Sequence, residues 1–172
     1  MERLTDAVRG ERTLLESLLF KLVQTQLLLA ADEVRFVPES AREVRQARQR
    51  ACSADLGRAA IVGGLKKAGD NAPDPTLRQL AARASEPWSG MLRDHHDALC
   101  ALVAEIELAA HHNARFAQEG LLRVQEQSGR HPAALRTEDD PTLSLVARHS
   151  AYRSVLGTAD SLRMPALLAF LI

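Results

Sequence analysis

The sequence predicts an all-α protein, on two observations. Aromatic residues make up 3% of the 172 residues, while Ala, Leu and Arg dominate the composition. A core of small and aliphatic side chains suits closely packed helices better than a sheet. Apolar residues also recur at alternating steps of four and three along three long segments, which is the spacing of one helix face. We therefore expect an elongated antiparallel helical bundle or coiled coil of three long helices, one short helix and a C-terminal tail helix.

Length and charge limit the classes of function. A chain of this length favours one domain, in which residues 1–127 form the helical bundle and residues 128–172 form a linker and an apolar C-terminal tail. The 22 Lys and Arg residues balance 22 Asp and Glu residues. Because this balance gives no general basic surface, nucleic acid is not an expected partner.

The first long helix is predicted over about Arg3 to Ala31. Every third or fourth position of this segment contributes to one continuous seam: Leu4, Val8, Glu11, Leu15, Leu18, Leu22, Thr25 and Leu29. Further apolar residues are expected to widen the buried stripe: Leu14, Leu19, Phe20, Val23 and Leu27. Glu16 and Lys21 interrupt the apolar stretch, so we expect a core helix and no stable membrane insertion.

The second long helix is predicted to begin near Ala41. Pro38 disfavours a helical backbone at Val37 and removes a backbone donor, so a connector is expected there. Ser40 and Glu43 have the spacing of a capping box, in which the two side chains satisfy backbone donors that a helix start leaves free.

Glycine and proline mark the limits of the next elements. Gly69 is the expected left-handed cap of the second helix. Asp74-Pro75 fits an N-cap followed by proline in the first helical position, which starts a short helix towards Ala84. The longest helix then runs from about Glu86 to Gln127 without an interior proline.

The C-terminal part is predicted to hold one modest helix and an apolar end. Pro132 cannot continue the long helix, and Asp140-Pro141 fits the start of a further one. The seam of that further helix is Leu145, His149, Tyr152 and Leu156. The apolar end, 165–172, is expected to fold back over Phe116 to Val124, either as a permanent core element or as a substitute helix that competes with a partner.

The paired histidines suggest a metal site, but their spacing argues against one. His95-His96 and His111-His112 lie on the longest helix. A di-metal site in a bundle needs Glu-x-x-His on two helices, whereas Glu107 and His111 are four apart. The sequence also lacks the common nucleophile and phosphate-binding motifs. We expect no metal, no cofactor and no enzymatic activity.

Charge is segregated along the chain. Segment 35–67 carries eight positive and three negative residues, whereas segment 86–119 carries six negative and two positive residues. Complementary packing of solvated helix faces explains this pattern. The alternative is an acidic partner that docks on a basic row: Arg42, Arg45, Arg48 and Arg50.

The end of the longest helix is the candidate partner-binding region. Phe116, Leu121, Leu122 and Val124 lie where this helix outruns the first two helices, so those helices cannot cover them. Either a foreign helix or the chain's own tail is expected to do so. Asn113 occupies a seam position where an apolar residue is expected, and a polar group there fixes register at a cost in stability.

Short motifs on three of the predicted helices carry a family resemblance. They are Glu11-Arg12 with Leu14-Leu15-Glu16 and Leu18 to Leu22, Pro75 to Arg78 with Leu80-Ala81, and Glu86-Pro87-Trp88. Together with the ending from Pro165 to Leu171, they resemble the FlgN family of bacterial flagellar export chaperones over most of the chain. Within this family, the chain resembles the form found in actinobacteria.

The resemblance implies a cytoplasmic chaperone without catalytic residues. Its partners would be the C-terminal helices of hook-associated proteins of the FlgK and FlgL type, which it keeps unassembled and delivers to the export apparatus. Better-known members carry two Asn residues three apart, then Gly and a Leu pair. They lie on the last helix of those members. In the longest helix here Asn113 is the only Asn, Phe116 or Ala110 holds the second Asn position, and Ala117 or Ala114 replaces the Gly. By this match the partner-binding residues are Asn113, Phe116, Ala117, Gly120, Leu121 and Val124.

Two other classes of protein stay open as alternatives. Trp88-Ser89-Gly90 is similar to the turn of small secreted helical hairpin proteins of type VII secretion. Those proteins need an acidic residue four positions after a Tyr, whereas here the residue four positions after Tyr152 is Leu156. A structural coiled-coil adaptor would form a stable oligomer along the seams.

Cys52 and Cys100 lack CxxC spacing, which fits two reduced thiols in a cytosol.

Overall fold

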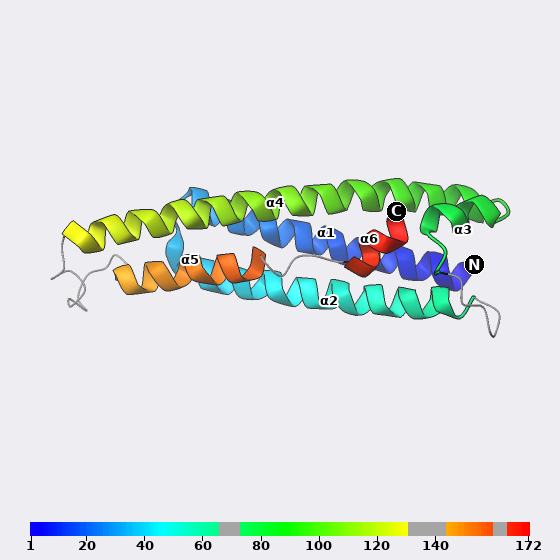
Figure 1. Ribbon diagram of the computed structural model, residues 1–172, viewed down its shortest axis with the longest axis horizontal. Coiled ribbons are helices and arrows are strands. Elements are labelled where there is room, and N and C mark those ends of the chain that lie inside the picture. Colours follow the sequence, from blue (N-terminus) through cyan, green and yellow to red (C-terminus); the bar gives the residue numbers. More distant parts are fainter. Residues whose placement is uncertain (66–72, 131–143, 160–164) are drawn as a thin grey trace. The chain divides into compact units, whose positions relative to one another are not determined.

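The computed structural model describes residues 1–65, 73–130, 144–159 and 165–172 (Figure 1). These residues form helices and no strand, which confirms the all-α prediction. In chain order the elements are α1 (Glu2–Ala30), the 3₁₀-helix η1 (Val34–Phe36), α2 (Val37–Gly63), α3 (Leu77–Arg83), α4 (Trp88–Arg130), α5 (Leu145–Ala159) and α6 (Pro165–Leu171). Gly69, Pro132 and Asp140-Pro141, which the sequence marks as caps or breakers, lie outside the described residues.

The chain divides into two compact units. Unit 1 comprises Met1–Leu18, Ala47–Glu105 and Arg163–Ile172, and unit 2 comprises Leu19–Gln46 and Ile106–Leu162. The helices α1, α2 and α4 each contribute one part to unit 1 and another part to unit 2. Helices α3 and α6 contact each other within unit 1, and α5 packs against η1 within unit 2.

The seam predicted for α1 is confirmed. All eight of its side chains are buried, including the polar Glu11 and Thr25. The expected widening of the buried stripe is wrong at Phe20, Val23 and Leu27, whose exposed fractions are 64%, 41% and 66%. A helix that packs through a narrow seam buries only that stripe, and these three side chains lie outside it.

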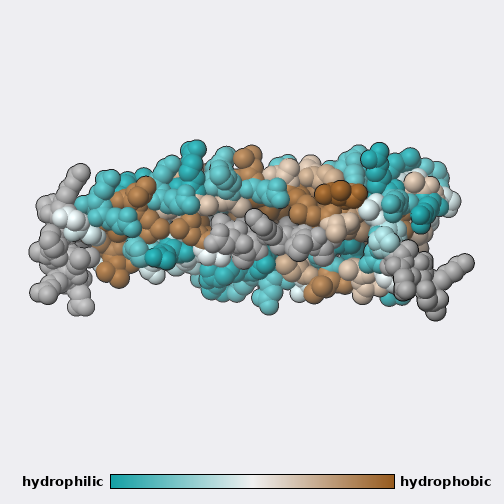
Figure 2. All heavy atoms as spheres, in the orientation of Figure 1, coloured by the Kyte–Doolittle hydropathy of each residue, from teal (hydrophilic) through white to brown (hydrophobic). Residues whose placement is uncertain are grey.

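Apolar side chains therefore reach the surface. Atoms of hydrophobic residues interrupt the hydrophilic surface on the face drawn in Figure 2. Among the described helices, α1 is the one with the length and hydropathy of a membrane span, with a mean hydropathy of 1.3 and 28% of the apolar window buried. Core helices and signal sequences meet the same criteria, so the expectation of no stable membrane insertion stays a prediction.

The end of α1 is a Schellman motif that fixes the backbone at Asp32. The N–H of Glu33 donates to the carbonyl oxygen of Leu28 over 2.9 Å, and the N–H of Asp32 donates to that of Leu29 over 3.3 Å. Asp32 has a φ of 55°, the left-handed conformation that this motif requires and that Asp tolerates better than most residues. The motif therefore holds the Asp32 side chain at a defined point after α1.

The expected start of α2 is wrong by one helical turn. The helix begins at Val37, and Pro38 is tolerated in the first turn because its missing N–H would have no helical acceptor there. Ser40 thus lies inside α2 and caps nothing. Its Oγ is instead 2.6 Å from Thr25 Oγ1 of α1, a buried hydroxyl pair that fixes the alignment of the two helices within unit 2.

The expected cap of α3 is also wrong. Thr76, and not Asp74, is the N-cap, because Thr76 Oγ1 accepts the N–H of Gln79 over 3.3 Å. The side-chain oxygen of Gln79 accepts the N–H of Thr76 over 3.2 Å, which completes a capping box.

A buried ion cluster organises the core of unit 1. Arg58 of α2 donates from Nε to Glu11 Oε2 of α1 over 2.8 Å, and from Nη2 to Asp55. Its guanidinium lies 3.7 Å from the ring centre of Phe170 in α6. Loss of Arg58 would leave the buried carboxyl groups of Glu11 and Asp55 without their shared positive partner. Burial raises the pKa of the Glu11 carboxyl to about 7, and the charge of Arg58 opposes this rise.

The apolar C-terminal end occupies a different place from the expected one. It was expected over Phe116 to Val124, which belong to unit 2, but α6 lies in unit 1. Leu167, Phe170 and Leu171 are buried there, and His96 Nε2 is 3.2 Å from the carbonyl oxygen of Leu171. An apolar sequence predicts burial without specifying the covering helix, which is why the expectation failed.

Glu11 is expected to make stability depend on pH. Its carboxyl has a pKa of about 7 in the folded chain, above the ordinary value of 4.5 that applies in the unfolded chain. The folded state binds the proton more tightly, so this contribution to stability is complete below the unfolded pKa and is lost as pH rises through the folded pKa. At about 1.4 kcal/mol per pKa unit, the loss is roughly 3 kcal/mol.

Urea unfolding of the wild type and of Glu11→Gln at about pH 5 and about pH 8 measures this effect. The wild type should lose more unfolding free energy than the variant between the two pH values. Equal losses in the two proteins would show that Glu11 does not titrate in this range.

Candidate functional site

The candidate site is a face of α4 that α5 covers within unit 2. Ala117, Gly120 and Val124 of α4 are buried on this face. We name these three residues the α5 seat. The surrounding buried cluster combines residues from α1, η1, α2 and α5: Leu29, Val34, Val37, Ala41, Ala151, Tyr152 and Val155.

Gly120 forms a notch in the α5 seat that holds the ring of Tyr152. A Cβ placed on Gly120 would lie 2.4 Å from Tyr152 Cζ and 2.5 Å from Cε1, distances that non-bonded carbon atoms do not reach. The exposed fraction of Tyr152 is 2%. The two helices therefore approach this closely only because position 120 carries no side chain.

Polar contacts to Asp32 hold the same part of α5. Arg148 Nη1 donates to both carboxylate oxygens of Asp32, over 3.2 Å and 3.1 Å, and the Tyr152 hydroxyl donates to Asp32 Oδ1 over 3.2 Å. Because Arg148 and Tyr152 are four residues apart, they leave the same face of α5. The Asp32 side chain is 56% exposed, so water screens this ion pair and its contribution is at most about 1 kcal/mol.

The buried face of α5 differs from the seam predicted for it. Ser144 caps the helix, since its Oγ accepts the N–H of Ala147 over 3.2 Å. Tyr152 is buried as expected, whereas the other seam residues are only half-buried: Leu145, His149 and Leu156. The fully covered face is instead Ala151, Tyr152, Val155 and Thr158. Insertion of the Tyr152 ring into the notch accounts for this rotation.

The start of α5 and the end of α4 line an open hollow of about 310 Å³. Its lining comes from Val124, Gln125 and Ser128 of α4 and from Leu145, Val146 and His149 of α5. The two helices are thus less closely packed here than at the Gly120 notch.

The structure separates the six residues predicted to bind a partner into three groups. Three of them form the α5 seat. Phe116 and Leu121 are partly buried and pack against the same cluster. Asn113 is buried and its Nδ2 donates to the carbonyl oxygen of Leu22 over 2.9 Å, while its Oδ1 has no hydrogen-bond partner among the described residues. Asn113 therefore joins α4 to α1.

Two residues that hold α5 were not identified from the sequence. Asp32 and Arg148 are 116 positions apart, so no local pattern links them. The available signals were an Asp directly after the last apolar turn of α1, and an Arg four residues before the only Tyr of the chain.

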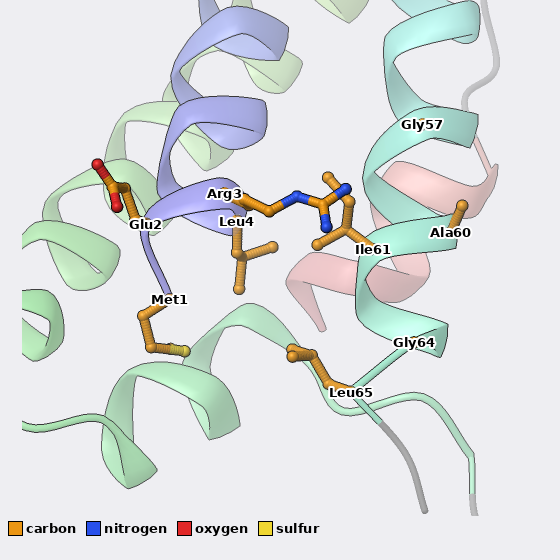
Figure 3. Close-up of a pocket in the computed structure, with 9 residues that line it drawn as sticks. All are labelled: Met1, Glu2, Arg3, Leu4, Gly57, Ala60, Ile61, Gly64 and Leu65. Carbon is orange, nitrogen blue, oxygen red and sulfur yellow. The ribbon is translucent and has the colours of Figure 1, made fainter. Parts of the chain in front are cut away.

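A second concave surface lies in unit 1, between the first turn of α1 and the last turns of α2 (Figure 3). Its volume is about 740 Å³. Small residues on the α2 side leave this space open: Gly57, Ala60 and Gly64. Figure 3 shows the Arg3 side chain reaching towards Ile61, and Glu2 is the one carboxylate of the lining.

The histidine pairs lie apart from both surfaces. In the part of the chain that the structure describes, no three His, Cys, Asp or Glu side chains are grouped to hold a metal ion. His96 Nδ1 is 2.9 Å from Asp97 Oδ1. Burial lowers the pKa of His95, and positive charges on α1 lower it further.

Comparison with known proteins found no protein-family model, no curated protein and no solved structure that matches this chain. The family resemblance of the sequence therefore stays a prediction. Function is inferred from the geometry of the α5 seat.

Replacement of Gly120 by Ala is expected to release α5 from α4. The added methyl group would overlap the Tyr152 ring, although Ala favours a helical backbone over Gly by about 1 kcal/mol. Hydrogen exchange followed by mass spectrometry should show faster exchange at the α5 amides while α4 stays protected.

Gly10→Ala is the matched control, because a Cβ at Gly10 would meet no atom within 4 Å. This variant should exchange at α5 as the wild type does. If Gly120→Ala also leaves α5 exchange unchanged, the notch does not hold the helix.

Proposed function

We propose that this protein is a cytoplasmic export chaperone that binds an amphipathic helix of its cargo at the α5 seat. The observation that supports the proposal is that a helix of the chain itself fills this seat, with the Tyr152 ring in the Gly120 notch. A surface that accepts one helix can accept another of similar shape. The scaffold that we propose for this role is an antiparallel arrangement of the three long helices with one short helix and a tail helix.

The short length of α5 supports an exchange of helices at the seat. The helix has 15 residues, and isolated helices of this length are marginal in water. Its helical state therefore depends on contacts with the rest of unit 2. A cargo helix that buries more apolar surface on the same face would replace it, since burial stabilises by about 25 cal/mol per Å².

The resemblance to the FlgN family suggests which cargo this is. It points to C-terminal helices of hook-associated proteins of the FlgK and FlgL type, passed on to the export apparatus. A helix destined for an assembly exposes its apolar face beforehand, and covering that face prevents early association. The α5 seat offers such a cover.

Joint replacement of Phe116 and Leu121 by Ser is expected to abolish binding of a hook-associated C-terminal peptide. Both side chains are partly buried at the edge of the seat, so a bound helix would lose apolar contact with them. Titration calorimetry measures the binding, and circular dichroism should show almost unchanged helicity.

Leu122→Ser is the control for this test, because Leu122 is on the same helix and is 59% exposed. It should bind the peptide as the wild type does. Binding that survives the double replacement would place the groove elsewhere. Co-purification from the native cell identifies the cargo itself.

The exposed stripe of Phe20, Val23 and Leu27 favours a second candidate, a structural coiled-coil adaptor. Steps of three and four place these side chains on one face of α1, and a second copy of the chain could cover them. Sedimentation equilibrium separates the two candidates. A stable oligomer that Phe20→Ser dissociates would support the adaptor, and a monomer would support the chaperone.

A further inference from the structure

We infer that the helix accepted by the α5 seat carries an aromatic residue and, four positions before it, a basic residue. This inference rests on the proposed function and specifies the chemistry of the partner. Gly120 supplies a place for the aromatic ring, and Asp32 supplies a place for the positive charge. The partner is thus a helix with one positively charged and one aromatic residue on its bound face, and this face follows the pattern of α5.

The Gly120 notch selects the aromatic residue by shape. The ring of Tyr152 occupies the space of a missing Cβ and is almost fully buried there. A smaller side chain would leave this space empty and forfeit its contacts. Tyr fits better than Phe, because the hydroxyl of Tyr152 also donates to Asp32 Oδ1 over 3.2 Å.

The Asp32 carboxylate selects the basic residue by charge. The Schellman motif at the end of α1 fixes its backbone, so the carboxylate is positioned by α1. Its side chain is 56% exposed and can be reached by an incoming cation. A single nitrogen of Arg148 bridges both carboxylate oxygens, whereas an acidic residue at that position would be repelled.

The spacing between the two selected residues follows from helix geometry. Residues four apart lie one above the other on a helix face, so the two fixed features of the seat can be met together by one helix in one register. Between and after them, α5 places the small Ala151 and the branched Val155 in the buried cluster. The pattern read from the seat is therefore basic, two variable positions, small, aromatic, two variable positions, aliphatic.

A synthetic peptide with the sequence of residues 144–159 tests the inference. The receptor is the full chain with Tyr152→Ala, in which the chain's own α5 no longer fills the notch. Fluorescence anisotropy should show that the labelled peptide binds. A peptide with Tyr152→Ala should bind at least tenfold more weakly and a peptide with Arg148→Glu several-fold more weakly, whereas a peptide with Arg153→Glu, changed at an exposed position of α5, should bind as the parent does.

A charge exchange separates recognition by Asp32 from general loss of helicity. A receptor that carries Asp32→Arg with Tyr152→Ala should bind the Arg148→Glu peptide better than it binds the parent peptide. If Tyr152→Ala prevents folding, as judged by circular dichroism, Val155→Asp takes its place in both receptors. This change also weakens the packing of the chain's own α5 on the seat, because Val155 lies in the buried cluster.

The outcomes decide the inference separately from the proposed function. Equal binding of the parent and the Arg148→Glu peptides would overturn the selection of charge, and equal binding of the parent and the Tyr152→Ala peptides would overturn the selection of the ring. Failure of every peptide to bind either receptor would overturn the inference as a whole. Peptide binding with the expected selectivity, together with no binding of hook-associated segments, would uphold the inference and overturn the proposed cargo.

Discussion

The close approach of α5 to α4 is the constraint on which unit 2 depends. The Tyr152 ring lies where every residue other than glycine has a Cβ, so α4 admits this helix only at Gly120. Once the ring is in place, its hydroxyl reaches Asp32, and Arg148 one turn earlier reaches the same carboxylate. One absent side chain thus fixes both the position and the rotation of α5, and with them the burial of its neighbouring apolar residues.

The helices could be predicted from the sequence because apolar periodicity is a local property, and the α1 seam is buried along its whole length. The helix ends were harder to predict, because several Ser, Thr and Asp residues within a few positions could each act as the N-cap. Ser40 fits a capping pattern, yet its hydroxyl pairs with Thr25 of another helix. Thr76 caps α3 because Gln79 completes its box, an advantage that the proline after Asp74 does not offset.

Of the candidate site, only the part on α4 could be predicted from the sequence. The length of α4 predicted a site near its end, but the expectation that the first two helices leave this part of α4 uncovered is wrong, because the buried cluster there includes Leu29 of α1 and Val37 of α2. The helix that covers this site could not be predicted. Both α5 and α6 have apolar residues to bury, and burial alone does not choose between two surfaces. Specific contacts make the choice: Phe170 of α6 lies on the Arg58 guanidinium in unit 1, and Tyr152 of α5 enters the notch in unit 2. Such long-range complementarity leaves no pattern in a single sequence.

The contacts of α5 divide into two kinds with different consequences. Burial of the Tyr152 ring removes apolar surface from water and contributes roughly 1.5 to 3 kcal/mol. The ion pair between Asp32 and Arg148 faces solvent, contributes at most about 1 kcal/mol and weakens with salt. Ring burial therefore supplies most of the attraction, while the carboxylate distinguishes a basic helix from an acidic one. Burial of Ala151 and Val155 in the same cluster adds to the attraction. The proposed exchange therefore requires a partner helix that has the same two features and buries a larger apolar face than α5 does.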